Sequence, residues 1–189
     1  MYLFFDTETT GLPKKWNAPV TDINNWPRLI QIAWVFTDNK GTLINKSNYI
    51  IKPENFTIPY EVSKIHRITT ERANKDGVVL EKVLHLFNDY IFESDYIVAH
   101  NISFDEKIIG AEFIRKGIFT NFFSKQKLCT MKASTNFCKI PGPYGYKWPK
   151  LSELHTKLFG VDFEEAHDAA ADIKATVKCF WEMRKRNLI

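Results

Sequence analysis

The sequence contains few cysteines. Cys129, Cys138 and Cys179 are the only ones in 189 residues. They are too few and too scattered for a disulfide framework or a zinc ribbon, so we expect reduced, buried thiols. There is also no run of about 18 apolar residues, which argues against a membrane-spanning helix. The opening residues MYLFFDTE include no basic leader and no small-residue cleavage site. We therefore expect no signal peptide and a cytoplasmic location.

Internal repeats and linker-like tracts are absent as well. Hydrophobic residues make up 44% and charged residues 25% of the sequence, an ordinary globular composition that excludes disorder for most of the chain. The length favours a single domain over residues 1–189. The formal net charge of +4 permits a polyanionic partner such as a nucleic acid without requiring one.

The apolar pattern predicts an α/β or α+β domain with one mixed sheet flanked by helices. We expect strands at 2–5, 96–99 and 127–130, and a hairpin of strands at 29–37 and 43–51. We expect helices at 80–91, at 103–116, at 151–159 and at 168–186. Ser103 and Glu106 have capping-box spacing at the start of the second helix. The buried stripe of the last helix is expected to be Ile173, Val177, Phe180 and Trp181.

Residues 140–149, IPGPYGYKWP, contain prolines and glycines that argue against regular structure, so a loop is predicted. Its aromatics Tyr144, Tyr146 and Trp148 are candidates for stacking on the bases of a single strand. A loop held onto the core by these same aromatics is an equally good interpretation.

Two acids, Asp6 and Glu8, flank a threonine where the first strand ends. Side chains two apart on a strand point to the same face, so both carboxylates project together. Burying a carboxylate is costly unless it is paired or bound to a metal. Taken alone, this pair is more simply explained as a solvated strand end.

Three further residues fall at predicted helix starts. Asp105 lies in the first turn of the helix that follows strand 96–99, where the helix dipole favours a carboxylate. Asp172 lies one turn inside the last helix, whose N-cap we expect at Asp168. His167 precedes that helix, and a lone histidine in a turn is more often structural than catalytic. Each residue therefore has a structural explanation when it is considered alone.

Considered together, the four carboxylates of Asp6, Glu8, Asp105 and Asp172 should converge on one edge of an α/β sheet. In one cleft they would repel unless a cation lay among them. All-oxygen ligands select hard ions such as Mg²⁺ or Mn²⁺. Two such ions about 3.5–4 Å apart could bind both oxygens of an in-line phosphoryl displacement. His167 could then take a proton from the attacking water near neutral pH.

These residues resemble the DEDDh (DnaQ-like) family of 3′–5′ exonucleases, which includes the proofreading epsilon subunit of DNA polymerase III and RNase T. The stretch FFDTETTGL, residues 4–12, matches the first motif of that family. Asn101 and Asp105 match the second motif, and His167 and Asp172 match the third, with agreement in order and spacing from residue 4 to about residue 181. Residues 65–69 resemble the family's His-Gly-Ile-Thr stretch, with Arg67 in place of the glycine.

The resemblance implies an RNase H-like fold with a central mixed sheet. It also implies a two-metal enzyme that uses Mg²⁺, with Mn²⁺ as a substitute, and releases 5′-nucleoside monophosphates from the 3′ end of single-stranded DNA or RNA. Asp6, Glu8 and Asp172 would hold one ion. Asp6 would also touch the second ion, which Asp105 would bind directly or through water. His167 would be the general base.

The resemblance further implies a set of substrate contacts. Thr7, Thr9, Gly11 and Leu12 would line the 3′-terminal nucleotide, with Leu12 wedged against a base. Asn101 and Phe104 would lie beside that nucleotide, and His66 would contact its sugar.

Other functions remain open at this point. A nucleic-acid-binding module without turnover would be expected to have a broken acidic set, whereas all five residues are present. An endonuclease or transposase-type enzyme of RNase H-like fold is disfavoured by the spacing of His167 and Asp172. A polymerase-associated proofreader and a freestanding trimming nuclease both fit. Because the chain ends at Ile189, soon after the last helix, we expect the freestanding form. No residue in the sequence indicates whether DNA or RNA is preferred. The sequence also does not indicate whether the protein forms a homodimer.

Overall fold

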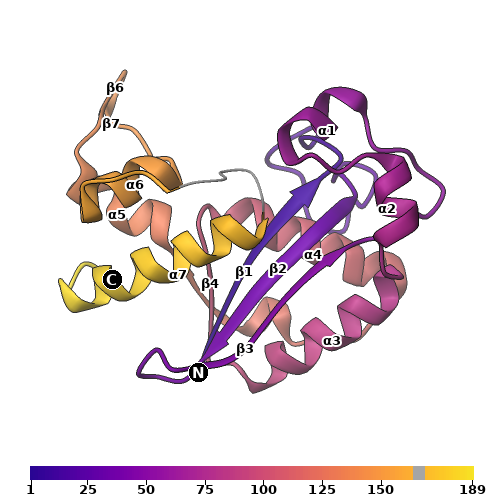
Figure 1. Ribbon diagram of the computed structural model, residues 1–189, viewed down its shortest axis with the longest axis horizontal. Helices are drawn as coiled ribbons and strands as arrows, with labels where there is room; N and C mark the ends of the chain where they lie inside the picture. The colour runs from indigo at the N-terminus through magenta and orange to yellow at the C-terminus, as the bar shows by residue number, and fades with distance from the viewer. Residues whose placement is uncertain (164–168) are drawn as a thin grey trace.

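The computed structural model describes residues 1–163 and 169–189 (Figure 1). Its strands are β1 (Tyr2–Thr9), β2 (Leu29–Thr37), β3 (Leu43–Ile50), β4 (Tyr96–Ala99), β5 (Gln126–Cys129), β6 (Pro141–Gly142) and β7 (Gly145–Tyr146). Its helices are α1 (Tyr60–His66), α2 (Thr70–Asp76), α3 (Leu80–Glu93), α4 (Ile102–Lys116), α5 (Thr130–Cys138), α6 (Leu151–Phe159) and α7 (Ala169–Lys185), with a short 3₁₀ helix at Phe122–Ser124.

A five-stranded sheet in the order β3-β2-β1-β4-β5 forms the centre of the molecule. β1 pairs with β2 and β2 with β3 in antiparallel fashion, whereas β1 and β4, and β4 and β5, are parallel. The sheet is therefore mixed, as the sequence predicts, and the fold is the expected α/β architecture. A separate two-stranded hairpin joins β6 to β7.

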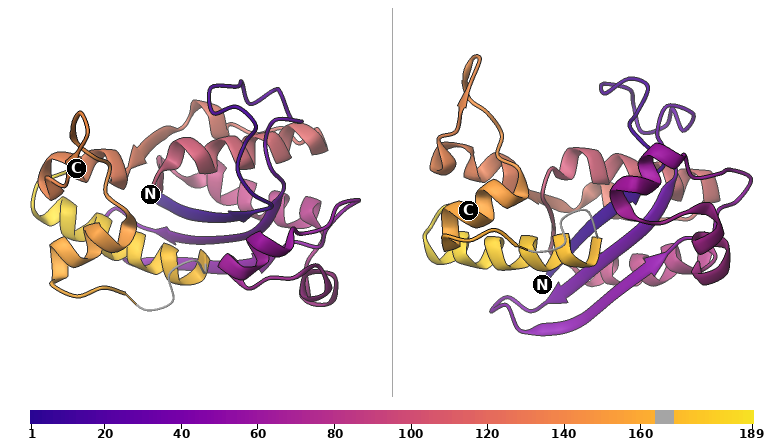
Figure 2. Two further views of the ribbon diagram at one scale, coloured as in Figure 1. Left: turned by 90° about the horizontal axis from the view of Figure 1, so that it is seen from above. Right: turned by 45° about the horizontal axis from the view of Figure 1, so that its top comes forward.

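The alternation of side chains along β1 divides the core into two layers. Leu3 and Phe5 belong to the cluster formed with α3 and α4, whereas Tyr2 and Phe4 belong to the cluster formed with α7. Phe4 packs against Phe180 of α7, with ring centroids 5.0 Å apart. Figure 2 shows α4 and α7 on opposite sides of the strands. Each face of β1 therefore meets the first turn of a different helix, which is the arrangement that builds the site.

The hairpin of β2 and β3, the helices α3 and α6 and the strand β4 confirm the predicted elements. β1 is longer than expected, because its backbone continues to pair with β2 as far as Thr9. The last predicted strand is displaced by one residue, since β5 ends at Cys129 and a helix begins at Thr130. In the predicted stripe of α7, Ile173 and Phe180 are buried, whereas Val177 and Trp181 are only half-buried.

The capping box predicted for α4 is wrong. The helix begins at Ile102, so Ser103 lies inside it and its hydroxyl donates to Oδ1 of Asn101. Asn101 precedes the helix with φ 69°, a left-handed conformation that asparagine tolerates better than most residues. The abrupt turn from β4 into α4 thus depends on Asn101 rather than on a side-chain cap.

Three helices and two strands were not predicted from the sequence. α1, α2 and α5 are short helices of seven to nine residues, and residues 140–149, predicted as a loop, contain the hairpin of β6 and β7. The predicted N-cap Asp168 lies outside the described residues. No helix in the described ranges is long and apolar enough to cross a membrane.

The three cysteines are free, as expected, with Cys138 and Cys179 buried and Cys129 half-buried. Burial raises the pKa of the Cys179 thiol to about 12. A thiol with so high a pKa stays protonated and unreactive at neutral pH.

Candidate active site

Three carboxylates meet where β1 passes the first turn of α7. Asp6 and Glu8 continue the alternation of Tyr2 and Phe4, so they lie on the face of β1 that α7 covers. Asp172 lies in the first turn of α7. One ligand atom from each of Asp6, Glu8 and Asp172 lies within 4.8 Å of the other two. These three acids, distant in sequence, therefore form one cluster.

The chemistry of this cluster fits a divalent cation. All three side chains are half-buried, so their mutual repulsion is less screened than it would be in open water. A cation bound among them would relieve that repulsion. Among the described residues this cluster offers carboxylate oxygens and no nitrogen or sulfur ligand, and such donors suit hard ions of the Mg²⁺ or Mn²⁺ class.

Asp105 approaches from the opposite face of β1. It lies in the first turn of α4, its side chain is 4% exposed, and its Oδ1 accepts a hydrogen bond of 2.7 Å from the Thr7 hydroxyl. Burial raises the pKa of Asp105 to about 7; hydrogen bonds from Thr7 and from the backbone oppose this rise, and the charge of Asp172 adds to it. Asp105 thus senses the cluster but is not among the three acids whose oxygens lie within 4.8 Å of one another.

The structure therefore brings together three of the four predicted carboxylates and places the fourth next to them. The fifth predicted catalytic residue, His167, lies outside the described residues, which resume at Ala169 at the start of α7. The first turns of α4 and α7 both approach β1 (Figure 1).

The residues predicted to line the terminal nucleotide differ in their surroundings. The Thr7 side chain is buried, and its hydroxyl donates a hydrogen bond to Asp105 and so supports that carboxylate. Thr9 is also buried, and its hydroxyl donates to the carbonyl of Gly11. Gly11 has φ 145°, a backbone conformation that favours glycine. Leu12, by contrast, is 73% exposed.

Phe104 is half-buried directly before Asp105, and its ring lies 5.8 Å from that of Trp16 in the loop between β1 and β2. Asn101 is half-buried at the start of α4. His66 is buried at the end of α1, where its Nδ1 accepts a hydrogen bond from the Ile68 N–H. Burial also lowers the pKa of His66, so the ring is neutral at physiological pH.

Sequence reasoning missed two residues near this site. His100 directly follows β4, with Nδ1 2.9 Å from the Thr130 hydroxyl and Nε2 3.0 Å from the Pro149 carbonyl. Because burial lowers the pKa of His100 to about 4, its ring is neutral, and Nε2 carries the proton that the Pro149 carbonyl accepts. His100 therefore ties the end of β4 to the segment that follows the β6–β7 hairpin. The second residue is Trp16, for which the lysines before it were the only available signal.

The aromatics of residues 140–149 are exposed. Tyr144 is fully exposed, and Tyr146 and Trp148 are more than half exposed. The interpretation that these side chains hold the segment onto the core is therefore wrong. The Lys132 ammonium lies 6.0 Å from the centre of the Trp148 ring, within the range of a cation–π contact. Figure 1 shows the β6–β7 hairpin projecting beyond α5 and α6.

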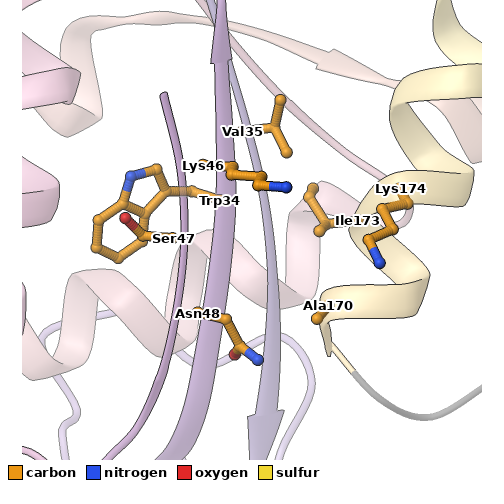
Figure 3. Close-up of a pocket in the computed structure, with 8 residues that line it drawn as sticks. All are labelled: Trp34, Val35, Lys46, Ser47, Asn48, Ala170, Ile173 and Lys174. Carbon is orange, nitrogen blue, oxygen red and sulfur yellow. The ribbon is translucent and has the colours of Figure 1, made fainter. Parts of the chain in front are cut away.

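A separate pocket of about 280 Å³ lies between β2, β3 and α7 (Figure 3). Val35 and Ile173 face one another across it, Lys46 and Lys174 lie at its edges, and Trp34 points away from α7. Among the described residues that line this pocket, none is a carboxylate and two are lysines, so this lining offers a cation no anionic ligand. The acidic cluster remains the candidate for chemistry.

Comparisons with known proteins agree with this geometry. The family model described as Exonuclease (RNase_T) matches residues 3–180. A PolC-type DNA polymerase III of Streptococcus suis (strain 98HAH33) is 31% identical over 175 residues, which are 93% of this chain and 10% of that protein. The chain thus spans about a tenth of the polymerases it matches. A protein of Escherichia phage 186, named uncharacterized exonuclease CP81, is 30% identical over 186 residues and is covered to 84% of its length.

Among solved structures, exonuclease I has the same fold. One such structure matches 99% of this chain and 42% of its own chain, with a TM-score of 0.76 and 20% sequence identity. E. coli exonuclease I in complex with a dA16 oligonucleotide gives a TM-score of 0.74 at 21% identity. This likeness confirms the predicted RNase H-like fold.

Proposed function

Because this chain belongs to the exonuclease family, we propose that it is a divalent-metal-dependent 3′–5′ exonuclease that degrades single-stranded DNA or RNA to 5′-nucleoside monophosphates. The observation that carries the proposal is the cluster of Asp6, Glu8 and Asp172 within 4.8 Å. The proposal takes residues 1–189 as one catalytic domain acting in the cytoplasm. The direction of degradation rests on the resemblance of the three motifs to the DEDDh pattern.

In this proposal Asp6, Glu8 and Asp172 hold one ion. Asp6 would also touch a second ion, which Asp105 would bind directly or through water. When bound, the two ions would neutralise charge at the phosphate and favour ionisation of the attacking water. Mg²⁺ is the expected ion and Mn²⁺ a substitute. Support for a metal comes from the three carboxylates that the described part of the chain brings together and from a zinc-bound structure of E. coli exonuclease I with single-stranded DNA.

The protein side chains supply positioning and proton transfer. Thr7 fixes the rotamer of Asp105 through its hydrogen bond. We assign His167 as the general base that takes the proton of the attacking water, since an unperturbed imidazole titrates near neutral pH. Leu12 and Phe104 provide exposed or half-exposed apolar surface for the terminal nucleotide, next to the acids in sequence. Asn101 and His66 are further proposed contacts of that nucleotide.

Single strands suit the exposed aromatics better than duplexes do, because unstacked bases can lie on aromatic rings. Solved complexes of E. coli exonuclease I contain dA16 and dT13 oligonucleotides. We propose the same class of partner for this chain, with the β6–β7 hairpin as a second contact for strands long enough to reach it.

A role beside a DNA polymerase is the second candidate function. It is favoured by the match to PolC-type DNA polymerase III proteins, of which this chain covers about a tenth. Co-purification of the chain with a replicative polymerase would support this role. A binding module without turnover is the remaining alternative, and the intact set of acids speaks against it.

The proposal is tested with 5′-labelled linear single strands of DNA and RNA and with a circular single strand, in Mg²⁺, Mn²⁺ or EDTA. We expect stepwise shortening of the linear strands from their 3′ ends, an intact circle, and no reaction in EDTA. Cutting of the circle would show an endonuclease instead.

A further inference from the structure

The loop between β1 and β2, residues 10–28, is held in a fixed conformation. At its base, the Thr10 N–H donates to the Arg28 carbonyl and the Arg28 N–H donates to the Thr10 hydroxyl, both at 2.9 Å. From α4, the Arg115 guanidinium donates to the Trp26 carbonyl at 2.7 Å and also to the Ile23 carbonyl. In Figure 2 this loop, in dark indigo, rises beside α4.

Asn25 fixes the part of the loop that carries Lys14 and Lys15. Its side chain is 5% exposed; its Oδ1 accepts from the Lys15 N–H at 2.7 Å, and its Nδ2 donates to the Lys15 carbonyl at 3.0 Å. Its own carbonyl accepts from the Lys14 N–H at 3.1 Å. The buried Asn25 amide thus bonds to both the N–H and the carbonyl of Lys15. These two bonds fix the backbone directly before Trp16.

The two tryptophans of this loop have opposite environments. Trp26 is 4% exposed, and its Nε1 donates to the Pro19 carbonyl. Trp16 is 61% exposed, and its indole lies 5.8 Å from the Phe104 ring at an angle of 47°. Trp26 accounts for the internal packing of the loop. Trp16 presents an indole to solvent, supported from behind by the residue that precedes Asp105.

The positive charge beside Trp16 suits a polyanionic ligand. Lys14 and Lys15 are exposed directly before it, and residues 9–21 contain no acid. A rigid aromatic next to lysines is the combination that binds single strands, because the ring stacks on a base while the ammonium groups contact phosphates.

We propose that Trp16, supported by Phe104, is a stacking platform for a base near the 3′ end of a single strand, with Lys14 and Lys15 on the neighbouring phosphates. This assignment rests on the proposed exonuclease function and adds a substrate-binding residue to it. Because the platform is fixed by Asn25 and Arg115, the base meets a surface that is already in place, and little conformational freedom is lost on binding.

The test distinguishes contacts with bases from contacts with phosphates. Affinity is measured by fluorescence anisotropy in Ca²⁺, which keeps the strand intact, for an oligothymidylate of about eight nucleotides and for an abasic strand of equal length. Trp16→Ala should weaken binding of the oligothymidylate by about 5–100-fold and leave the abasic strand unchanged. Trp16→Phe should restore most of the loss. An oligouridylate in place of the oligothymidylate shows whether RNA uses the same platform.

Two controls complete the design. The double variant Lys14→Ala, Lys15→Ala should weaken the binding of both strands and reduce the salt dependence of binding. Phe119→Ala, which removes another exposed aromatic just past the far end of α4, should change neither affinity. Equal losses for both strands in Trp16→Ala, or no loss at all, would overturn the assignment. Because binding is measured without turnover, failure of the platform is distinguishable from failure of the exonuclease function.

Discussion

The Thr7 hydroxyl donates a hydrogen bond of 2.7 Å to Oδ1 of Asp105, a residue 98 positions away in the sequence. The bond joins β1 to the first turn of α4 on the face of the sheet opposite to Asp6 and Glu8. Burial raises the pKa of Asp105 to about 7, and the Thr7 hydrogen bond limits that rise. A buried carboxyl group binds a cation strongly only in its ionised form. Protonation of Asp105 and metal binding should therefore be linked.

We expect the metal-free protein to lose stability as the pH rises from about 4 to about 7. Asp105 has a pKa of about 7 in the folded protein against an ordinary value of 3.8, so the folded state retains a proton that the unfolded state releases. The difference is on the order of 4 kcal/mol above pH 7. Urea unfolding in EDTA across this pH range measures it.

The matched variants for this test are Asp105→Asn and Thr7→Val. Asparagine cannot ionise, so the pH dependence should flatten. Valine removes the hydrogen bond that lowers the pKa of Asp105, so the loss of stability on raising the pH should become larger. If wild type and Asp105→Asn showed the same slope, the assignment of this titration to Asp105 would be wrong.

His167→Ala should lower kcat by about 10²–10⁴-fold, the usual contribution of a general base. Since His167 is not assigned as a metal ligand, Mg²⁺ should still raise the melting temperature of the variant as it does that of the wild type. His85, an exposed histidine on α3, is the control, and His85→Ala should be fully active. Loss of the Mg²⁺ effect in His167→Ala would reassign the residue to metal binding.

Arg67→Gly should stabilise the protein by about 0.5–1 kcal/mol. Arg67 is exposed and ends α1 with φ 59°, a left-handed conformation that costs most residues about 1–2 kcal/mol and glycine almost nothing. Part of this gain is lost because glycine has more freedom in the unfolded chain. Urea unfolding measures the change. Lys82→Gly, at an exposed position inside α3, should instead destabilise by about 1 kcal/mol.

Removing both Tyr144 and Tyr146 should weaken binding of single strands of about 20 nucleotides by roughly 10-fold or more, because each ring can stack on a base. Stability should be unchanged, since Tyr144 is fully exposed and Tyr146 is half exposed. Hydrolysis of a dinucleotide serves as the control and should be unaffected, because the hairpin is proposed as a second contact for long strands. A loss with the dinucleotide that matched the loss with the long strand would place the hairpin at the catalytic centre instead.

The sequence was sufficient for features that follow from local pattern. Asp6 and Glu8 share a face because alternate residues of a strand do, and the neighbourhood of Asp172 follows from the strand and helix order. The engagement of Thr7 by Asp105 could not be predicted, because it depends on how α4 packs on the opposite face of β1. For the same reason the sequence did not separate Asp105 from the three clustered acids.

The errors in secondary structure also have physical causes. Ser103 has the spacing of a cap, but Asn101 takes a left-handed conformation and starts the helix earlier. The short helices α1, α2 and α5 have too few residues for a periodic pattern to stand out. The role of His100 depends on the Pro149 carbonyl, 49 residues away, and no local signal reports such a contact.

The central claim is that Asp6, Glu8 and Asp172 form a metal site on which hydrolysis depends. It is tested most directly by degradation of a 5′-labelled single strand in Mg²⁺ by the wild type and by Asp172→Asn, an isosteric change that removes one charge from the cluster. We expect the wild type to shorten the strand stepwise from its 3′ end, and the folded variant to show no detectable shortening. Undiminished activity in Asp172→Asn, or in wild type with EDTA, would contradict the account.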